Sequence, residues 1–416
     1  MVRGMVVAAM MKWCVGAAYS RQLRLFCLCG LGLSTPCVQA AEWVVEPHIT
    51  TSITYDDNVF FTQSQPVDSV GVQVLTGISL NRNTENLVAS LSGSLLVREY
   101  EDDALVDSVD PGIAIDLNRI GERHHLGFSA DYKRQTTLFS EIDSTGPVQL
   151  DRRVNRISLQ PSWRYQFSPL ASVQLNYTWS DTDYDALPTE FSDYTNQVLQ
   201  LGYQYGFTER TSLGLQYLHS ELDIPDTGVA GLPGVKSLTK SDAFYIGLNH
   251  KFGKTVNFDL QIGNRNTEEK VTYVPFLGQP VFINKGEGRL YSINVNRIGE
   301  NLSVGFSAKQ DLTPASNGQL NETETFRANI SWVSSRRSRI NLTIGHLRTK
   351  PAISSSQVER QYSWVKPSIN YKLGERSSLI ASYQYARQKL GNAAEAADSN
   401  SLIFSLKYQW PGTTLN

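Results

Sequence analysis

The sequence lacks long apolar runs, and its sulfur-containing residues are confined to one end. The chain has 416 residues, 41% of them hydrophobic. No stretch after the first 40 residues approaches the ~18 consecutive apolar residues that a membrane-spanning helix needs. All four cysteines and all four methionines lie within those first 40 residues. These absences exclude a polytopic helical membrane protein and a small domain held together by disulfides.

The first 40 residues have the layout of a secretory signal peptide. Basic residues precede an apolar stretch at 25–33, and a small-residue cleavage site ends at Ala40. The apolar stretch is too short to anchor the chain in a membrane as a helix. We therefore expect a signal peptide at 1–40, cleavage near Ala40, and a mature domain at 41–416 that contains no thiol.

The mature chain is acidic overall. Removing the leader takes four of the 38 basic residues and none of the 40 acidic ones, so the formal net charge falls from −2 to −6. This balance gives no support to nucleic-acid binding, which depends on neutralising phosphates with basic residues.

Motifs for catalysis and metal binding are missing. The six histidines are scattered, with no HExxH motif and no cysteine partner, so we expect no metal, no cofactor and no catalytic residue. A hydrolase embedded in a barrel would need a nucleophile and a base within hydrogen-bond reach, for example His219 beside a serine. The sequence leaves that alternative open, but we expect the protein not to be an enzyme.

What the sequence does contain is alternation of apolar and polar residues, from about residue 47 to 410. In Val173–Ser180 every odd position is apolar or aromatic and every even position is polar, the pattern of a strand with one apolar face. Such segments run about 9 to 13 residues, near the ~9–11 that a tilted strand needs to cross a bilayer. Eight short polar turns alternate with nine longer loops. We therefore expect one transmembrane antiparallel up-and-down β-barrel of eighteen strands, with sixteen as the nearest alternative.

Two other all-β architectures share parts of this pattern. A soluble sandwich alternates too, but its strands and connections are shorter. The letters of Asn118–Glu122 recur at Asn296–Glu300, each time followed by Gly-Phe-Ser-Ala, which indicates a repeated strand, tight turn and strand. Propellers have a similar period of roughly 40 residues, but each of their blades needs four short strands.

Aromatic residues gather at the ends of the expected strands. Trp163, Tyr165 and Phe167 precede one short turn, and Tyr408 and Trp410 end the last strand. Aromatic girdles at the two membrane interfaces account for this placement. The last strand is similar to the C-terminal signal read by the barrel-assembly machinery, which we expect as a partner, although a six-residue tail follows it.

Charges divide between the two kinds of connection. The first four long loops hold fourteen acidic residues and no basic one, whereas the eight short turns are mainly basic. We expect an acidic external rim, which divalent cations could bridge to lipopolysaccharide and outer-membrane lipid, and a basic periplasmic rim. The acidic residues assigned to the external loops are Asp56, Asp57, Asp102, Asp103, Asp181, Asp183 and Asp185.

Strand alternation also assigns residues to the interior of the barrel. If the apolar positions face lipid, ten basic and four acidic side chains face inward, which predicts a preference for anionic solutes. The predicted interior residues are Arg98, Asp116, Asp131, Lys133, Arg156, Arg164, Lys251, Asp259, Lys309, Asp311, Arg327, Lys366, Lys372 and Lys407.

An eighteen-stranded barrel encloses a bore wide enough for water. The strands and connections use up the mature chain, so no separate plug domain remains. Any obstruction would then come from loops that fold inward. We expect these loops to be 223–238, which is rich in Gly and Pro, and 268–287, which is unusually apolar for an exposed loop.

The segment Ile53–Thr62, with the letters Tyr-Asp-Asp-Asn-Val-Phe, resembles the start of the β-barrel porin-like proteins encoded with exopolysaccharide export and exosortase (PEP-CTERM) systems. The resemblance implies a conduit or accessory for exopolysaccharide export that works with periplasmic polysaccharide-export proteins. Asp and Asn also commonly form turns, which would explain the same letters. Two alternatives for function stay open: a general or anion-preferring diffusion porin, and a structural or adhesive surface barrel.

Overall fold

The computed structural model describes residues 43–101, 107–142, 146–148, 150–185, 191–225, 235–273, 280–316, 318–353, 359–391 and 395–415. The predicted signal peptide and its cleavage site lie outside the described residues, so both stay predictions.

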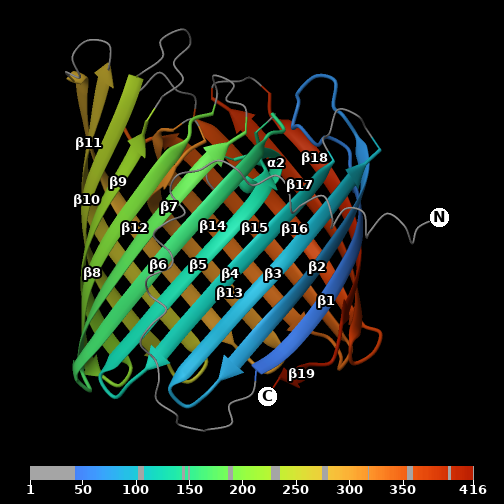
Figure 1. Cartoon of the computed structure of the whole chain (residues 1–416), viewed down its shortest axis with the longest axis horizontal. Helices are drawn as coiled ribbons and strands as arrows, with labels where there is room; N and C mark the ends of the chain where they lie inside the picture. Colours follow the sequence, from blue (N-terminus) through green and yellow to red (C-terminus); the bar gives the residue numbers. More distant parts are fainter. Residues whose placement is uncertain are drawn as a thin grey trace. The chain divides into compact units, whose positions relative to one another are not determined.

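The described chain forms an antiparallel sheet of eighteen long strands that closes into a barrel, as the alternation predicts (Figure 1). Each strand pairs with its neighbours in sequence, and β1 pairs with both β2 and β18, which closes the ring. One short helix, α2, follows β5, and no described helix is long and apolar enough to cross a membrane. The elements are β1 Trp43–Asp56, β2 Ser69–Asn83, β3 Leu87–Tyr100, β4 Ser108–Ile120, β5 His124–Thr136, α2 Thr137–Ser140, β6 Arg153–Ser168, β7 Ala171–Tyr184, β8 Tyr194–Thr208, β9 Thr211–Ile224, β10 Val235–Phe252, β11 Val256–Tyr273, β12 Pro280–Ile298, β13 Leu302–Pro314, β14 Leu320–Val333, β15 Ser338–Pro351, β16 Arg360–Lys372, β17 Ser377–Leu390, β18 Ala397–Gln409 and β19 Thr413–Leu415.

The strands are longer than the sequence analysis expects. They contain from 13 residues in β4 to 19 in β12, because they continue past the apolar belt into the segments expected to be long loops. The structure differs most from the expected loops in residues 223–238 and 268–287, which the sequence analysis expects to fold into the bore. Their described parts are mostly strand, at the end of β9, the start of β10, the end of β11 and the start of β12, and the rest lies outside the described residues.

Short turns join the strands at one end of the barrel, drawn at the bottom of Figure 1. The turn between β4 and β5 is closed by a 2.8 Å hydrogen bond from the Gly121 amide to the His124 carbonyl oxygen. Near this end, the rings of Trp163 and Tyr165 stack at 6.2 Å, and Tyr165 meets Phe167 edge-on at 4.8 Å. These outward rings match the expected aromatic girdle, since amphipathic rings favour the membrane interface.

Acidic residues join the first strand to the last. The Asp57 carboxylate accepts 2.7 Å hydrogen bonds from both the backbone and the side-chain nitrogen of Asn400. The Asp56 carboxylate accepts from the hydroxyls of Ser399 at 2.9 Å and Ser401 at 2.7 Å. Residues expected in an external loop thus hold together the seam where the ring closes.

The C-terminal tail extends the same seam. After Trp410 the chain forms β19, which pairs antiparallel with the beginning of β1, Val45 opposite Thr413. Because each added backbone pair satisfies donors and acceptors of an otherwise exposed strand, the tail covers the start of β1.

Candidate functional site: the barrel interior

Strand register and exposure separate an apolar outer face from a polar inner face. On β9 and β10, Leu215, Phe244 and Ile246 are 58%, 66% and 65% exposed. Gln216 and Tyr245 alternate with them and point to the opposite face. A continuous belt of exposed apolar side chains is removed from water only by lipid, so the barrel is built to span a membrane.

One connection folds inward and reaches the far wall. The crossing segment is defined as the described residues between β5 and β6, namely 137–142, 146–148 and 150–152. Its Pro147 carbonyl oxygen accepts hydrogen bonds from Arg360 at 2.7 Å and Gln388 at 2.8 Å. These two donors belong to β16 and β17, so the two walls that the segment joins lie six to eight strands apart the shorter way around the ring. Gly146 has φ +87°, and a Cβ there would lie 2.7 Å from Arg360 Cδ. Glycine therefore lets the segment approach this wall.

An apolar cluster holds the crossing segment against β15–β17. Leu347, Tyr362 and Ala386 are buried on the inner face, and Phe61 and Ile142 pack against them. The rings of Phe61 and Tyr362 meet edge-on at 5.7 Å. Apolar side chains inside a water-filled bore need a cover, and Ile142 of the crossing segment supplies part of it.

Glu141 fixes the other side of the segment. Its side chain is fully buried, and its Oε1 accepts hydrogen bonds from Arg156 at 3.4 Å and from the Tyr184 hydroxyl at 3.2 Å. The base of the segment is closed where the Thr137 amide donates to the Arg152 carbonyl oxygen at 2.8 Å. A buried carboxylate is tolerated when a cation and hydrogen-bond donors surround it, as they do here.

A second buried ion cluster lies beside α2. The Asp110 carboxylate, 4% exposed, pairs with Arg98 and with Arg153 Nη1, the latter at 2.5 Å. The Arg98 guanidinium also lies over the ring of Phe139 in α2, 4.6 Å from its centroid. The crossing segment is therefore held to the wall by charge as well as by packing.

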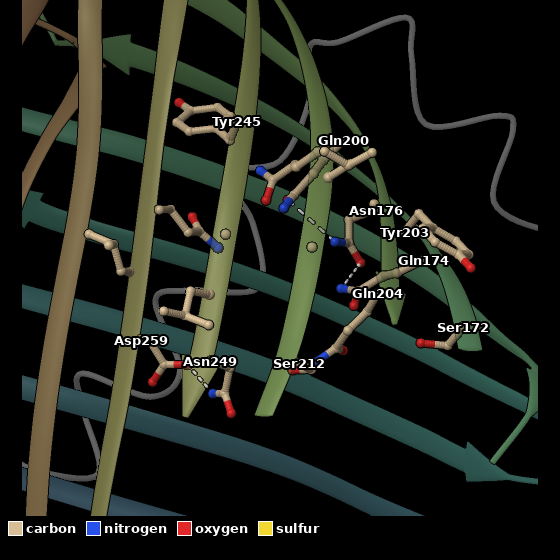
Figure 2. A pocket seen from close by; sticks show the side chains of 18 residues that line it. Ser172, Gln174, Asn176, Gln200, Tyr203, Gln204, Ser212, Tyr245, Asn249 and Asp259 are labelled. Carbon is tan, nitrogen blue, oxygen red and sulfur yellow. Dashed lines mark hydrogen bonds between the residues drawn. The ribbon is translucent and has the colours of Figure 1, made fainter. Parts of the chain in front are cut away.

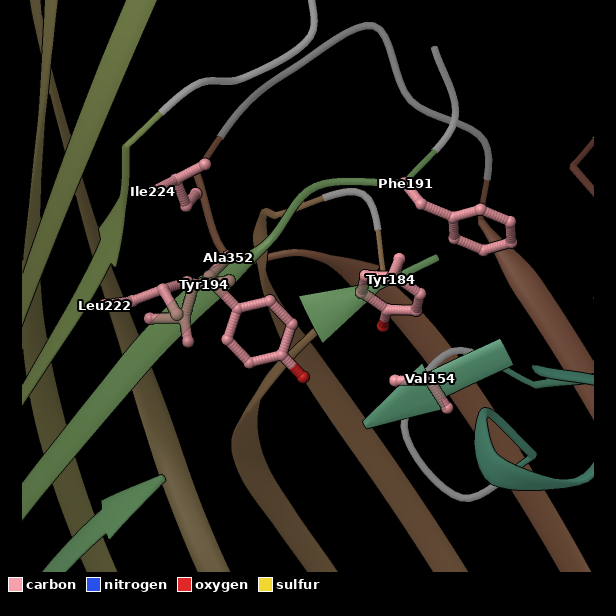
Figure 3. Close-up of a cluster of buried hydrophobic side chains, with 8 residues drawn as sticks. Val154, Tyr184, Phe191, Tyr194, Leu222, Ile224 and Ala352 are labelled. Carbon is pink, nitrogen blue, oxygen red and sulfur yellow. The ribbon is translucent and has the colours of Figure 1, made fainter. Parts of the chain in front are cut away.

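Near the loop end, further connections meet inside the barrel (Figure 3). The rings of Tyr184 and Phe191 stack at 5.0 Å, and the Ser192 amide donates to the Ser316 carbonyl oxygen at 2.9 Å. This contact joins the connection after β7 to the connection after β13. The apolar residues of this mouth cluster are Val154, Tyr184, Phe191, Tyr194, Leu222, Ile224, Leu320 and Ala352.

The ladder between β12 and β13 is short. It pairs only Tyr291–Ile298 with Ser303–Gln310, although β12 begins at Pro280. Beyond this ladder a buried ion pair joins β11 to β14. Arg265 Nη2 donates to Glu322 Oε2 at 2.7 Å, with the two side chains 1% and 7% exposed. The pair therefore ties β11 to β14 beyond the point where the ladder of β12 and β13 ends, and breaking it would leave an unpaired buried charge.

By strand alternation, the predicted interior residues occupy positions between those of the exposed apolar side chains. Several are neutralised there: Lys133 lies 3.7 Å from Asp131, and Arg156 contacts Glu141. The Asp116 carboxylate accepts from Ser129 at 2.7 Å. Direct contact of these side chains with a solute stays a prediction.

Three predicted lysines form a different group. Lys366 and Lys372 lie on β16, and Lys407 on β18, where it pairs with Ser378 of β17. None of the three makes an ion pair with any residue that the structure describes. We call Lys366, Lys372 and Lys407 the basic wall.

A hollow of about 190 Å³, with Asp259 as its one charged lining residue among those described, lies on a separate wall formed by β7–β11 (Figure 2). Amide side chains dominate it, and Gln174, Asn176 and Gln200 are linked in series by hydrogen bonds of 3.1 and 3.3 Å. We call this hollow the amide trough. Its polar lining residues are Ser172, Gln174, Asn176, Gln200, Gln204, Ser212, Gln216, Tyr245, Asn249, Asp259 and Gln261.

The acidic residues assigned to external loops have varied positions. Asp181 and Asp183 are at the end of β7, where Asp181 accepts from Thr195 at 2.7 Å, and Asp185 pairs with Arg134 at 2.6 Å. Asp102 and Asp103 lie outside the described residues. No group of His, Cys, Asp or Glu that could hold a metal occurs in the described part of the chain.

Two carboxyl groups in the connections have shifted pKa values. Hydrogen bonds from Arg348, at 2.8 and 3.0 Å, and from Gln361 lower the pKa of Glu359 to about 2. Burial, opposed by a backbone hydrogen bond and reinforced by the charge of Asp181, raises the pKa of Asp193. Glu359 is thus a carboxylate stabilised in its charged form by a cation, whereas burial makes the charged form of Asp193 less favourable.

Sequence reasoning missed the residues that build the obstruction. The strand alternation predicts one of the long external loops between β5 and β6, which contains Glu141 and Pro147, and it does not single out Arg360 or Gln388. Their partners are far away in sequence, 213 residues in the contact between Arg360 and Pro147. The available signal was the apolar content of 137–142 within a loop otherwise rich in polar residues.

Known proteins resemble this chain in fold alone. No protein-family model and no curated protein matches it. Similar solved structures include Pseudomonas aeruginosa OpdK with vanillate, 12% identical with a TM-score of 0.46 over 88% of this chain and 99% of that one. Acinetobacter baumannii OccAB4 is 11% identical, with a TM-score of 0.48 over 90% and 100%. The ferric citrate transporter FecA, unliganded, is 10% identical, with a TM-score of 0.47 over 89% and 70%.

Proposed function

We propose that the protein is a diffusion channel of the bacterial outer membrane that favours anionic solutes. The observation that supports this most directly is the basic wall: three lysines face the bore without an ion-pair partner among the described residues. Uncompensated charge of one sign in a narrow, low-dielectric passage raises the local concentration of counter-ions.

The crossing segment and the basic wall occupy different levels of the bore. The segment reaches β16 at its first residue, Arg360, at the loop end. Lys366 lies six residues further along this strand, and Lys372 is its last residue, near the short turns. Because salt screens a wall charge within about 8–10 Å, the lysines act on ions that pass close to this wall.

A triple variant, Lys366→Gln, Lys372→Gln and Lys407→Gln, tests the proposal. We expect the reversal potential across planar bilayers in a KCl gradient to indicate anion preference for the unmodified protein, and to move towards cation preference in the variant. The matched control removes three positive charges from the short turns, with Lys254→Gln, Arg336→Gln and Arg337→Gln. It should change the reversal potential much less than the triple variant does. Cation preference of the unmodified protein would contradict the proposal.

A conduit for exopolysaccharide export is the second candidate. The resemblance of Tyr55–Phe60 suggests it, and the hydrogen-bonding amide trough is compatible with a glycan in the bore. The structure gives Asp56 and Asp57 in this motif a role in closing the barrel, which any function would require. The test is cell-surface polysaccharide in a deletion strain, where an unchanged amount counts against export.

A further inference from the structure

The amide trough offers hydrogen-bonding groups that the protein itself does not use. The side chains of Gln216, Gln261 and Tyr245 line the trough and make no side-chain hydrogen bond to a described residue. Each carboxamide has two donor hydrogens and an acceptor oxygen, and the phenol has one donor and an acceptor. Sugar hydroxyls likewise donate and accept at each oxygen, so this wall matches a polyhydroxylated solute better than an ion.

The rest of the wall is fixed and nearly neutral. Arg164 donates to Gln174 at 2.7 Å, and Gln174 continues through Asn176 to Gln200. The carboxylate in the trough, Asp259, accepts from Asn249. Side chains held by neighbours lose little freedom when a ligand binds, which favours binding by modest hydrogen bonds.

Three glycines leave space in the trough, although neither their backbone conformation nor their neighbours would exclude a Cβ. Gly214 and Gly247 are directly opposite each other on β9 and β10, and Gly202 lies on β8. None has a positive φ, and a Cβ at any of them would meet no atom closer than 3.4 Å, ordinary contact. Glycine weakens a strand interior and marks places where a ligand approaches the backbone. Together with the unused amides, this spacing indicates room kept for a solute.

We propose that the amide trough binds neutral saccharides, one sugar ring or a short segment of an oligosaccharide at a time. Its volume, about 190 Å³, is below the ~300–1,000 Å³ of pockets that enclose a whole drug-sized ligand. The trough lies on β7–β11, apart from the basic wall on β16 and β18, so the two select by different chemistry. The inference rests on the proposed function in one respect, that solutes enter the bore.

The test uses the full mature barrel in detergent and in planar bilayers, with maltohexaose as a neutral probe. We expect binding in the millimolar range by calorimetry and transient interruption of the ion current. Gly214→Phe fills the trough, and Gln216→Leu with Gln261→Leu removes its free amides. Loss of one or two hydrogen bonds weakens binding about tenfold. The matched control, Ser382→Phe, adds the same ring to the inner face of β17 and should leave the affinity unchanged.

The outcomes separate this inference from the proposed function. Binding by calorimetry that the trough variants abolish, and that the lysine triple variant leaves intact, supports the trough even if the current shows no anion preference. Absence of maltohexaose binding to the unmodified protein overturns the inference, as does equal weakening by Ser382→Phe. Neither result alters the reversal potential on which the diffusion-channel proposal depends.

Discussion

Single residues decide how closely the crossing segment approaches the opposite wall. Gly146 combines a left-handed backbone conformation with a neighbour, Arg360 Cδ, 2.7 Å from where a Cβ would stand. A side chain at this position meets both a backbone penalty and a steric clash. Glu141 on the same segment is buried among Arg156 and Tyr184, so the segment is constrained on both sides.

Gly146→Ala should loosen the crossing segment. The left-handed conformation costs an alanine about 1–2 kcal/mol, and the clash with Arg360 adds to it. We expect a larger single-channel conductance or more frequent conductance fluctuations. The control is Gly253→Ala in the short turn after β10, where φ is +64° but no atom lies within 4 Å of a Cβ. Identical currents from the two variants would show that Gly146 does not limit the bore.

At the scale of elements, contacts between segments that are not neighbours in the sheet make one part of the barrel differ from another. The strands supply a regular wall, and the crossing segment, the contact between Ser192 and Ser316, and the ion pair of Arg265 with Glu322 break its symmetry. Each of these contacts joins segments that are not adjacent in the ladder. The strands also differ from one another, because β16 and β18 carry the basic wall and β7–β11 form the amide trough.

The position of the crossing segment can be trapped chemically, because the mature chain is expected to contain no native cysteine. With Pro147→Cys and Gln388→Cys, a short bifunctional thiol reagent should link the segment to β17. The two residues are close neighbours, because Gln388 Nε2 lies 2.8 Å from the Pro147 carbonyl oxygen. We expect a cross-linked loop, detected by altered gel mobility after denaturation, and a reduced single-channel current.

The control pairs Pro147→Cys with Ser382→Cys. Ser382 lies six residues from Gln388 on the same strand, about 20 Å away at ~3.3 Å per residue. No cross-link should form with the short reagent. Equal cross-linking of both pairs would mean that the segment is not held at the position described.

At the scale of the whole molecule, the barrel depends on the seam between its first and last strands. Closure lets every strand find two partners, which is required where no water can satisfy the backbone. The side chains of Asp56 and Asp57 add hydrogen bonds across this seam at the end of β1. At the start of β1, β19 adds further backbone pairing.

Asp57→Ala should weaken the closed barrel. It leaves the Asn400 amide and side chain without their acceptor, at a cost of about 1–3 kcal/mol. We expect the folded, fast-migrating gel band to convert to the unfolded one at a lower temperature than in the unmodified protein. Asp68→Ala is the control, because Asp68 is exposed and makes no hydrogen bond among the described residues. The same conversion temperature for both variants would exclude a role of Asp57 in closure.

Individual segments show which features of the fold the sequence predicts and which it does not. Val173–Ser180 predicts its strand because each side chain has to face either lipid or the polar interior, a local choice repeated every second residue. The same reasoning failed for 268–287, where apolar residues suggested an inward loop and β11 and β12 instead continue as strands. Alternation also could not predict that the crossing segment folds inward, because loops have no periodic pattern of apolar residues.

The sequence by itself determined the eighteen-stranded barrel and its apolar outer belt, because both follow from alternation along neighbouring residues. The assignment of the charged residues to the interior stays a prediction. Only the tertiary structure decided that the crossing segment reaches the far wall and that glycines of three strands line one hollow. It also decided that Arg98 and Arg156 pair with carboxylates, whereas Lys366, Lys372 and Lys407 pair with none among the described residues. The crossing depends on contacts between residues 213 and 241 positions apart, and the other features depend on contacts across neighbouring strands and connections, so no local pattern encodes them.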